Sequence, residues 1–162
     1  MLKYLNYQVT LGEIPGEITL CINITNCPHN CDGCHSPELR KNIGKILSVK
    51  VIDELIKNND GISCICFMGG DHDDESINRF IMHIKEKYPY MKTALYSGAE
   101  TTNDSIKKEY LNYYKIGPYR KELGGLKSPI TNQKLFKVFK NLPRKDGITL
   151  LEWSIFYKNK IK

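Results

Sequence analysis

The sequence predicts an α/β fold, a partial (β/α) barrel of about five or six mostly parallel strands with helices outside. Two observations lead to this class. Segments with the two-residue period of a strand alternate along the chain with segments that carry an apolar helical stripe. The chain has 162 residues, whereas a closed barrel typically takes about 250. We therefore expect an open barrel with one accessible side.

The first predicted strand covers residues 17 to 25. Large aliphatic side chains occupy every second position, which predicts a half-buried strand: Ile18, Leu20, Ile22 and Ile24. Ser48 is a typical N-cap for a helix over residues 49 to 58. The apolar stripe of this helix comprises Val51, Ile52, Leu55 and Ile56, and Asn59-Asp-Gly61 ends it.

The second strand is predicted over residues 62 to 67, a short apolar run that ends in Met68-Gly-Gly-Asp71. Asp73 or Asp74 then begins a helix that ends before Pro89, with one apolar face: Ile77, Phe80, Ile81 and Ile84. Further strands are predicted over residues 92 to 96 and 113 to 116, with a short helix over 104 to 111 between them. Residues 148 to 151 and 153 to 157 indicate late strands or a hairpin, in which Trp153 is a packing residue.

Composition predicts one domain over residues 1 to 162, with a core of about 17 to 139 and a tail of 140 to 162. No apolar stretch approaches the ~18 to 20 residues of a membrane span, and the first residues lack a secretory signal. We expect a cytoplasmic protein with no membrane partner. The net charge of +6 lies mostly beyond residue 114. Without clustered aromatic stacking motifs it predicts no direct nucleic-acid partner.

Three of the six cysteines, Cys27, Cys31 and Cys34, form a C-x3-C-x2-C motif directly after the first strand. A cluster of four irons and four sulfides usually takes four thiolates, so three leave one iron free for another ligand. Zinc is an alternative, with His29 or His35 as a fourth ligand, and so are inert thiols. The other cysteines lie inside apolar runs, as buried structural cysteines do: Cys21, Cys64 and Cys66.

Each unusual turn follows a predicted strand. Besides the cysteine loop, these turns are Gly69-Gly70-Asp71, Ser97-Gly98 and Lys115-Ile-Gly117. The carboxyl ends of parallel strands meet at one edge, so the four segments are expected around one mouth. The Gly-Gly-Asp turn either lets a backbone approach a ligand closely or is a plain turn before an acidic helix cap.

The cysteine motif followed by a glycine-glycine-acid turn resembles the radical S-adenosylmethionine enzymes. The Cys-x-Gly-Cys form and the short length resemble one branch, the anaerobic ribonucleoside-triphosphate reductase activating proteins. The segments that carry this second resemblance are Lys115-Ile-Gly-Pro-Tyr119, Glu122-Leu-Gly-Gly-Leu126 and Thr131-Asn-Gln133. The resemblance runs from about residue 2 to residue 139.

The resemblance implies a 4Fe-4S cluster on Cys27, Cys31 and Cys34, with S-adenosylmethionine on the fourth iron. It implies an enzyme that reductively cleaves S-adenosylmethionine to a 5′-deoxyadenosyl radical and then generates a glycyl radical on the anaerobic (class III) ribonucleotide reductase. The implied partners are the large reductase subunit and a small electron-donor protein such as flavodoxin. The implied contacts to S-adenosylmethionine are His35, Met68, Gly69, Gly70, Asp71, Ser97 and Lys115.

Three positions depart from the pattern of this branch. Asp71 stands where the turn usually ends in glutamate, and His35 where an aromatic residue is common. The segment before Lys115 reads Asn112-Tyr-Tyr, where an aspartate is frequent. His35 would stack beneath adenine, donate a hydrogen bond or remain solvated, and Lys115 would pair with the ligand carboxylate or be a surface lysine.

Other interpretations stay open from sequence. Thr131-Asn132-Gln133 either helps a partner's glycine loop to dock or caps the next element. The chain would alternatively activate another glycyl-radical enzyme, act on a small molecule by radical chemistry, or be a non-enzymatic iron-sulfur or zinc redox protein.

Overall fold

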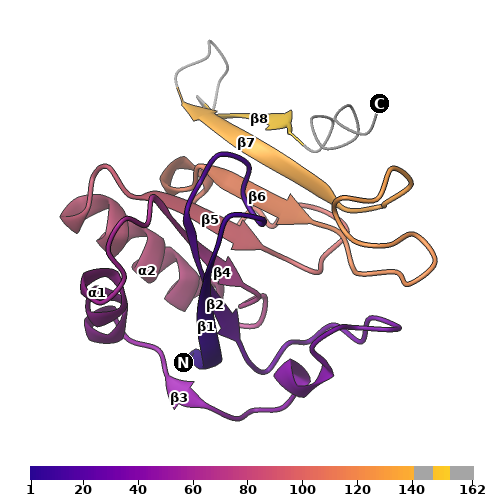
Figure 1. Cartoon of the computed structure of the whole chain (residues 1–162), viewed down its shortest axis with the longest axis horizontal. Helices are drawn as coiled ribbons and strands as arrows, with labels where there is room; N and C mark the ends of the chain where they lie inside the picture. The colour runs from indigo at the N-terminus through magenta and orange to yellow at the C-terminus, as the bar shows by residue number, and fades with distance from the viewer. Residues whose placement is uncertain (141–147, 154–162) are drawn as a thin grey trace.

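The computed structural model describes residues 1–140 and 148–153, in which one mixed sheet has the strand order β3-β1-β2-β4-β5-β6-β7-β8 (Figure 1). The strands are β1 Lys3–Thr10, β2 Thr19–Ile24, β3 Lys45–Ile46, β4 Cys64–Met68, β5 Lys92–Tyr96, β6 Tyr113–Ile116, β7 Lys134–Lys140 and β8 Ile148–Glu152. The α-helices are α1 Val49–Lys57 and α2 Asp74–Lys87, and short 3-10 helices cover Pro37–Arg40 and Lys108–Tyr110. The predicted α/β class is confirmed.

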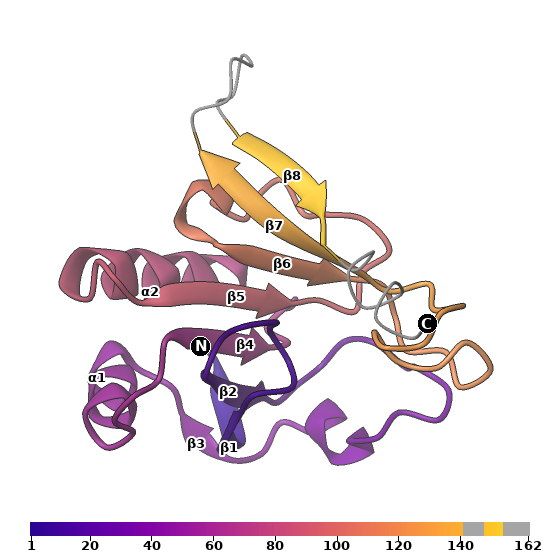
Figure 2. The ribbon, with the colours of Figure 1, turned by 45° about the horizontal axis from the view of Figure 1, so that its top comes forward.

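The centre of the sheet is parallel. Strands β2, β4, β5 and β6 pair in that order, with α1 between β2 and β4 in the chain and α2 between β4 and β5. The predicted helix starts are confirmed, because Ser48 Oγ accepts from the Val51 amide at 3.3 Å and Asp73 Oδ1 accepts from the Ser76 amide at 3.0 Å. Figure 2 shows the arrowheads of β5 and β6 pointing to one edge, where the segments after β2 and β6 also lie.

The predicted barrel of about five or six mostly parallel strands is wrong. The sheet has eight strands and is open, and four of its seven pairings are antiparallel. Strand β1 reaches β2 through residues 11–18, and a connection this short returns the chain antiparallel rather than crossing over. On the other side, β7 pairs antiparallel with both β6 and β8. The late strand expected over 148 to 151 is present, whereas residues 154 to 157 lie outside the described residues.

Both faces of the central sheet are covered. One face packs against α1 and α2 through side chains such as Ile22, Phe67 and Leu95. The other face carries Cys21, Cys64 and Cys66, all fully buried as expected, beneath Ile14, Leu126 and Trp153. Strand β2 is therefore buried on both faces, and the expectation of one solvated face is wrong. Residues 11–18, which include Ile14, cover the face of β2 that the alternation predicts to be exposed to solvent.

The helix expected over residues 104 to 111 is wrong, since only Lys108–Tyr110 forms a single 3-10 turn there. Side chains hold the backbone in another conformation. Asn103 Oδ1 accepts from the Ser105 amide at 2.8 Å, and Asn78 bonds the Ser105 carbonyl and the Lys107 amide, each at 2.8 Å. Such bonds compete with the helical ladder. Within the described part of the chain, no helix has the length and apolar character to cross a membrane.

A buried polar cluster joins the amino ends of the parallel strands. The Glu17 side chain is 5% exposed and accepts hydrogen bonds from Ser63 Oγ at 2.7 Å, from Tyr113 Oη at 2.9 Å and from Lys92 Nζ. Burial raises the pKa of Glu17, but these three hydrogen bonds outweigh it and hold the pKa below its ordinary value. The polar cluster therefore stabilises the sheet at the amino ends of its parallel strands. The cavity described below lies at their carboxyl ends.

Candidate functional site

A cavity of about 510 Å³ opens at the carboxyl ends of β2, β4, β5 and β6. It lies in the range of small-molecule sites, roughly 300 to 1,000 Å³. All the predicted site residues except Gly70 line it: Cys27, Cys31, Cys34, His35, Met68, Gly69, Asp71, Ser97 and Lys115. Gly70 is buried behind the wall, where a Cβ would lie 2.7 Å from Ile77 Cδ1. The expected meeting of the four turns around one mouth is confirmed.

The cysteine loop is fastened at both sides by hydrogen bonds. The Cys27 amide donates to the Leu39 carbonyl at 3.0 Å, and Arg40 Nη2 donates to the Cys31 carbonyl at 2.6 Å. The three thiols are free and half-buried. The Nε atom of Arg40 is buried and has no partner among residues 1–140 and 148–153, although Arg40 lines the same cavity as the thiols. The loop thus presents three thiols and a cationic side chain to one space.

The donor set fits an iron-sulfur cluster. Burial raises the pKa of the Cys27 thiol, and the negative charges of Asp71, Cys31 and Cys34 raise it further. Bound iron cations would offset that charge and favour the thiolates. Within the described ranges no three His, Cys, Asp or Glu side chains converge on a point that could hold a single metal ion. A cubane is compatible with this spacing, because each thiolate binds a different iron.

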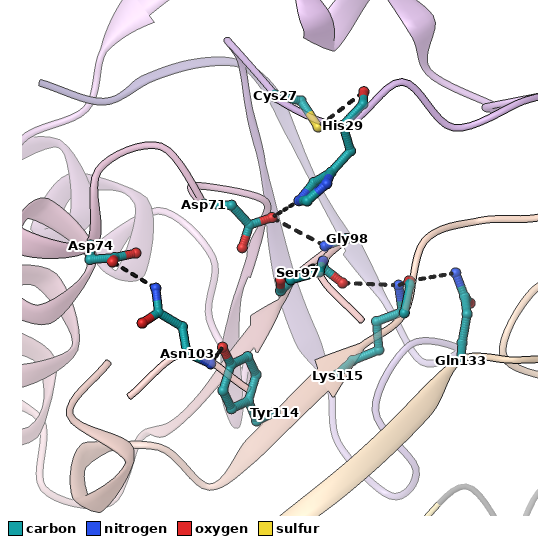
Figure 3. Close-up of polar contacts among 12 residues, drawn as sticks. Cys27, His29, Asp71, Asp74, Ser97, Gly98, Asn103, Tyr114, Lys115 and Gln133 are labelled. Carbon is teal, nitrogen blue, oxygen red and sulfur yellow. Dashed lines mark hydrogen bonds and ion pairs between the residues drawn. The ribbon is translucent and has the colours of Figure 1, made fainter. Parts of the chain in front are cut away.

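The Asp71 carboxylate lies between the cysteine loop and the end of β5 (Figure 3). Its Oδ2 atom is 2.8 Å from His29 Nε2 and accepts from the Gly98 amide at 3.1 Å. Sequence reasoning weighed His29 only as a zinc ligand and missed this contact. The one available signal was the position of His29 between Cys27 and Cys31.

Lys115 is a buried lysine in the cavity wall, not a surface lysine. Its Nζ donates to the Gly117 carbonyl at 2.7 Å and to the Ser97 carbonyl at 3.3 Å (Figure 3). Burial lowers the pKa of Lys115 to about 8, although the nearby charges of Cys31 and Asp71 act in the opposite direction. The cavity therefore contains a cationic group that is incompletely paired with acids.

The remaining predicted segments lie in or beside the cavity wall. The His35 ring contacts the Tyr119 ring, with centroids 4.6 Å apart. In the segment 131 to 133, Thr131 Oγ1 accepts from the Gln133 amide at 3.1 Å and donates to the Gly124 carbonyl at 3.3 Å, as a capping residue does. Gln133 reaches the cavity, where its Nε2 lies 3.4 Å from the Gly117 carbonyl.

Comparison with protein-family models matches residues 15–150 to a 4Fe-4S single cluster domain. The chain belongs to this family. The match spans most of the sequence and includes the whole wall of thiols, turns and lysine around the cavity. Family membership makes this an iron-sulfur protein. Comparison with curated proteins and with solved structures found no match.

Proposed function

We propose that the protein is a radical S-adenosylmethionine enzyme that generates a glycyl radical on the anaerobic ribonucleotide reductase. One observation carries the proposal: three free thiols from one loop, the Gly69 to Asp71 turn and a buried lysine line a single cavity at the ends of parallel strands. An electron carrier needs a cluster but has no use for a ligand-sized cavity beside it. The family of 4Fe-4S single cluster domains supplies the cluster itself.

Cys27, Cys31 and Cys34 would hold three of the four irons, which leaves the fourth open to the amino and carboxylate groups of S-adenosylmethionine. When bound and reduced, such a cluster would supply the single electron for reductive cleavage of S-adenosylmethionine, the chemistry from which hydrogen abstraction at a glycine would follow. The protein's own task is to hold, orient and enclose these groups.

The cavity wall offers suitable partners for the ligand. The Lys115 ammonium would pair with the carboxylate of the methionine moiety, since among residues 1–140 and 148–153 it donates to two carbonyl oxygens and forms no ion pair with an acid. The turn at Met68 and Gly69 carries no side chain at Gly69, where φ is +103°, so its backbone stays open to the ligand. Ser97 and His35 would complete the enclosure from the neighbouring strand end and the loop.

The proposed substrate is a glycine in the large reductase subunit, and the proposed reductant is a small electron-donor protein such as flavodoxin. The open sheet supports a macromolecular substrate, because an unclosed wall leaves room for a partner's loop.

The test begins with anaerobic reconstitution with iron and sulfide. We expect the wild type to bind a brown cluster and to form 5′-deoxyadenosine from S-adenosylmethionine with a strong reductant. Cys31→Ala should lose both properties, and Cys64→Ala, at a buried cysteine of the amino end of β4 that does not line the cavity, should keep both. A wild type that binds the cluster without cleaving S-adenosylmethionine would indicate a redox protein. Cleavage without a glycyl radical signal on added reductase would indicate another radical substrate.

A further inference from the structure

One side chain of the cysteine loop crosses to the sheet. His29 stands between Cys27 and Cys31, and its Nε2 lies 2.8 Å from Asp71 Oδ2 in the turn after β4. The two side chains are 25% and 15% exposed. A carboxylate only accepts hydrogen bonds, so Nε2 is the donor in this contact. The contact joins the segment that follows β2 to the segment that follows β4.

A third strand end meets the same pair. The Gly98 amide, just after β5, donates to Asp71 Oδ2 at 3.1 Å. The His29 ring packs directly on this glycine, because a Cβ at position 98 would lie 2.4 Å from His29 Cδ2. The segments that follow the neighbouring strands β2, β4 and β5 thus meet at the contact between His29 and Asp71 (Figure 3).

We propose that His29 and Asp71 form a latch that fixes the cysteine loop against the strand ends, which makes His29 a positioning residue of the cluster site. The inference rests on the proposed role of the three cysteines as cluster ligands. Cluster binding needs a loop whose thiols are held in place, and this loop contains no helix or strand between Cys27 and Cys34 to do so. The latch supplies that restraint from inside the ligand run.

The latch also accounts for the aspartate at position 71. Glutamate would carry the carboxylate farther by roughly one carbon–carbon bond, ~1.5 Å. That extension is incompatible with an undisturbed contact at 2.8 Å, since the His29 ring already lies against Gly98. Asp71 therefore serves the site by holding His29, and its length matches that histidine.

The experiment measures how fast a chelator strips the reconstituted cluster, followed by the loss of its visible absorbance under anaerobic conditions. His29→Ala and Asp71→Ala should each accelerate cluster loss about tenfold, the size of one charge-assisted hydrogen bond. The double variant should be no faster than Asp71→Ala, because Asp71→Ala already removes the bond to His29 as well as the bond from the Gly98 amide. His29→Gln, which keeps a donor, should recover part of the protection.

The chain offers a matched control in a second histidine–aspartate pair. His83 Nε2 lies 2.9 Å from Asp53 Oδ1 and links α2 to α1, away from the cavity. His83→Ala should leave cluster loss unchanged. Equal acceleration by His29→Ala and His83→Ala would overturn the latch, as would additive effects in the double variant. If His29 supplied a metal ligand instead, its substitution would lower the iron content before any chelator was added, which would also overturn it.

Asp71→Asn is a second variant for the case in which truncation to alanine impairs folding, because it keeps the shape of the side chain while weakening the acceptor. We expect cluster loss several-fold faster than in the wild type, and an unchanged rate would contradict the latch. None of these measurements requires cleavage of S-adenosylmethionine. A protein that shows the latch but cleaves no S-adenosylmethionine would therefore refute the proposed function alone.

Discussion

The Nζ atom of Lys115 lies 2.7 Å from the carbonyl oxygen of Gly117, two residues further along the chain. This contact folds the lysine back against the end of its own strand and buries it, with 8% of the residue exposed. A Cβ at position 117 would lie 2.9 Å from Gln133 Cα, so glycine lets this turn pack closely. The end of β6 thereby places the Lys115 ammonium in the cavity wall. Removing this charge from water destabilises the folded protein.

This destabilisation predicts a pH dependence of stability. The folded protein releases the Lys115 proton near pH 8, because burial lowers its pKa to about 8, whereas the unfolded chain keeps it to about pH 10. Between these values the unfolded state binds more protons, so stability rises with pH. Relative to Lys115→Met, the free energy of unfolding of the wild type should increase by about 2 to 3 kcal/mol from about pH 7 to about pH 10, at ~1.4 kcal/mol per pKa unit.

Denaturant unfolding of the two proteins at both pH values measures this difference. Lys57→Met, on the exposed surface of α1, is the control and should show no such change relative to the wild type. A constant difference between wild type and Lys115→Met across this range would contradict the buried cation.

At the amino ends of the parallel strands, Glu17 should stabilise the fold at neutral pH and lose this contribution in acid. Its pKa is lowered, so its contribution is present above the unfolded pKa and disappears as pH falls through the folded pKa. Glu17→Gln should lower the free energy of unfolding by about 2 to 4 kcal/mol at neutral pH, because the buried Tyr113 hydroxyl and the half-exposed Lys92 ammonium lose a charged acceptor.

The measurement is chemical denaturation of Glu17→Gln beside Glu54→Gln, an exposed glutamate on α1. The destabilisation by Glu17→Gln should shrink at acid pH, where the wild-type carboxylate also becomes protonated. Glu54→Gln should stay within about 0.5 kcal/mol of the wild type, as surface substitutions usually do. Equal effects of the two substitutions would refute the role of the buried cluster.

Arg40 should raise the reduction potential of the cluster. It lines the cavity, it donates to the Cys31 carbonyl, and its Nε is buried with no partner among the described residues. A cation and a hydrogen-bond donor beside a cluster favour its more negative, reduced state. Arg40→Gln should lower the potential by about 60 mV, ~1.4 kcal/mol for one electron.

Spectroscopic redox titration of the reconstituted protein measures the potential, with Arg79→Gln on α2 as the control. Arg79 lies over the Phe80 ring, 5.3 Å from its centroid, and its loss should leave the potential unchanged. A potential unaffected by Arg40→Gln would show that its guanidinium acts only on the loop backbone.

Sequence predicted the parts of the fold that local chemistry decides. The buried run of β4, the N-cap of α2 at Asp73 and the apolar face of that helix all follow from neighbouring residues. The meeting of four turns at one cavity follows from parallel pairing alone. The iron-sulfur cluster was predicted from the spacing of the three cysteines alone.

The rest depends on contacts between distant segments. The pairings of β1 with β2 and of β6 with β7 leave no mark in the hydrophobic period that distinguishes antiparallel from parallel neighbours. The helix predicted over residues 104 to 111 does not form because Asn78, far away in the sequence, accepts a hydrogen bond from the Lys107 amide. The contact between His29 and Asp71 joins residues 42 positions apart, and neither residue type alone predicts it.

The last prediction concerns Gly98, where the His29 ring occupies the space that a side chain would need. A Cβ at this position would lie 2.4 Å and 2.7 Å from two ring atoms of His29, so Gly98→Ala should lower the free energy of unfolding by about 1 to 3 kcal/mol. In a His29→Ala background the obstacle is gone, and the same substitution should cost less than about 0.5 kcal/mol. Gly125→Ala is the control, because Gly125 lines the same cavity and, its two chain neighbours aside, no atom of the described part of the chain would lie within 4 Å of the new Cβ. Thermal or chemical denaturation of these variants measures the interaction, and a cost at Gly98 that is independent of His29 would show that the ring does not rest on this glycine.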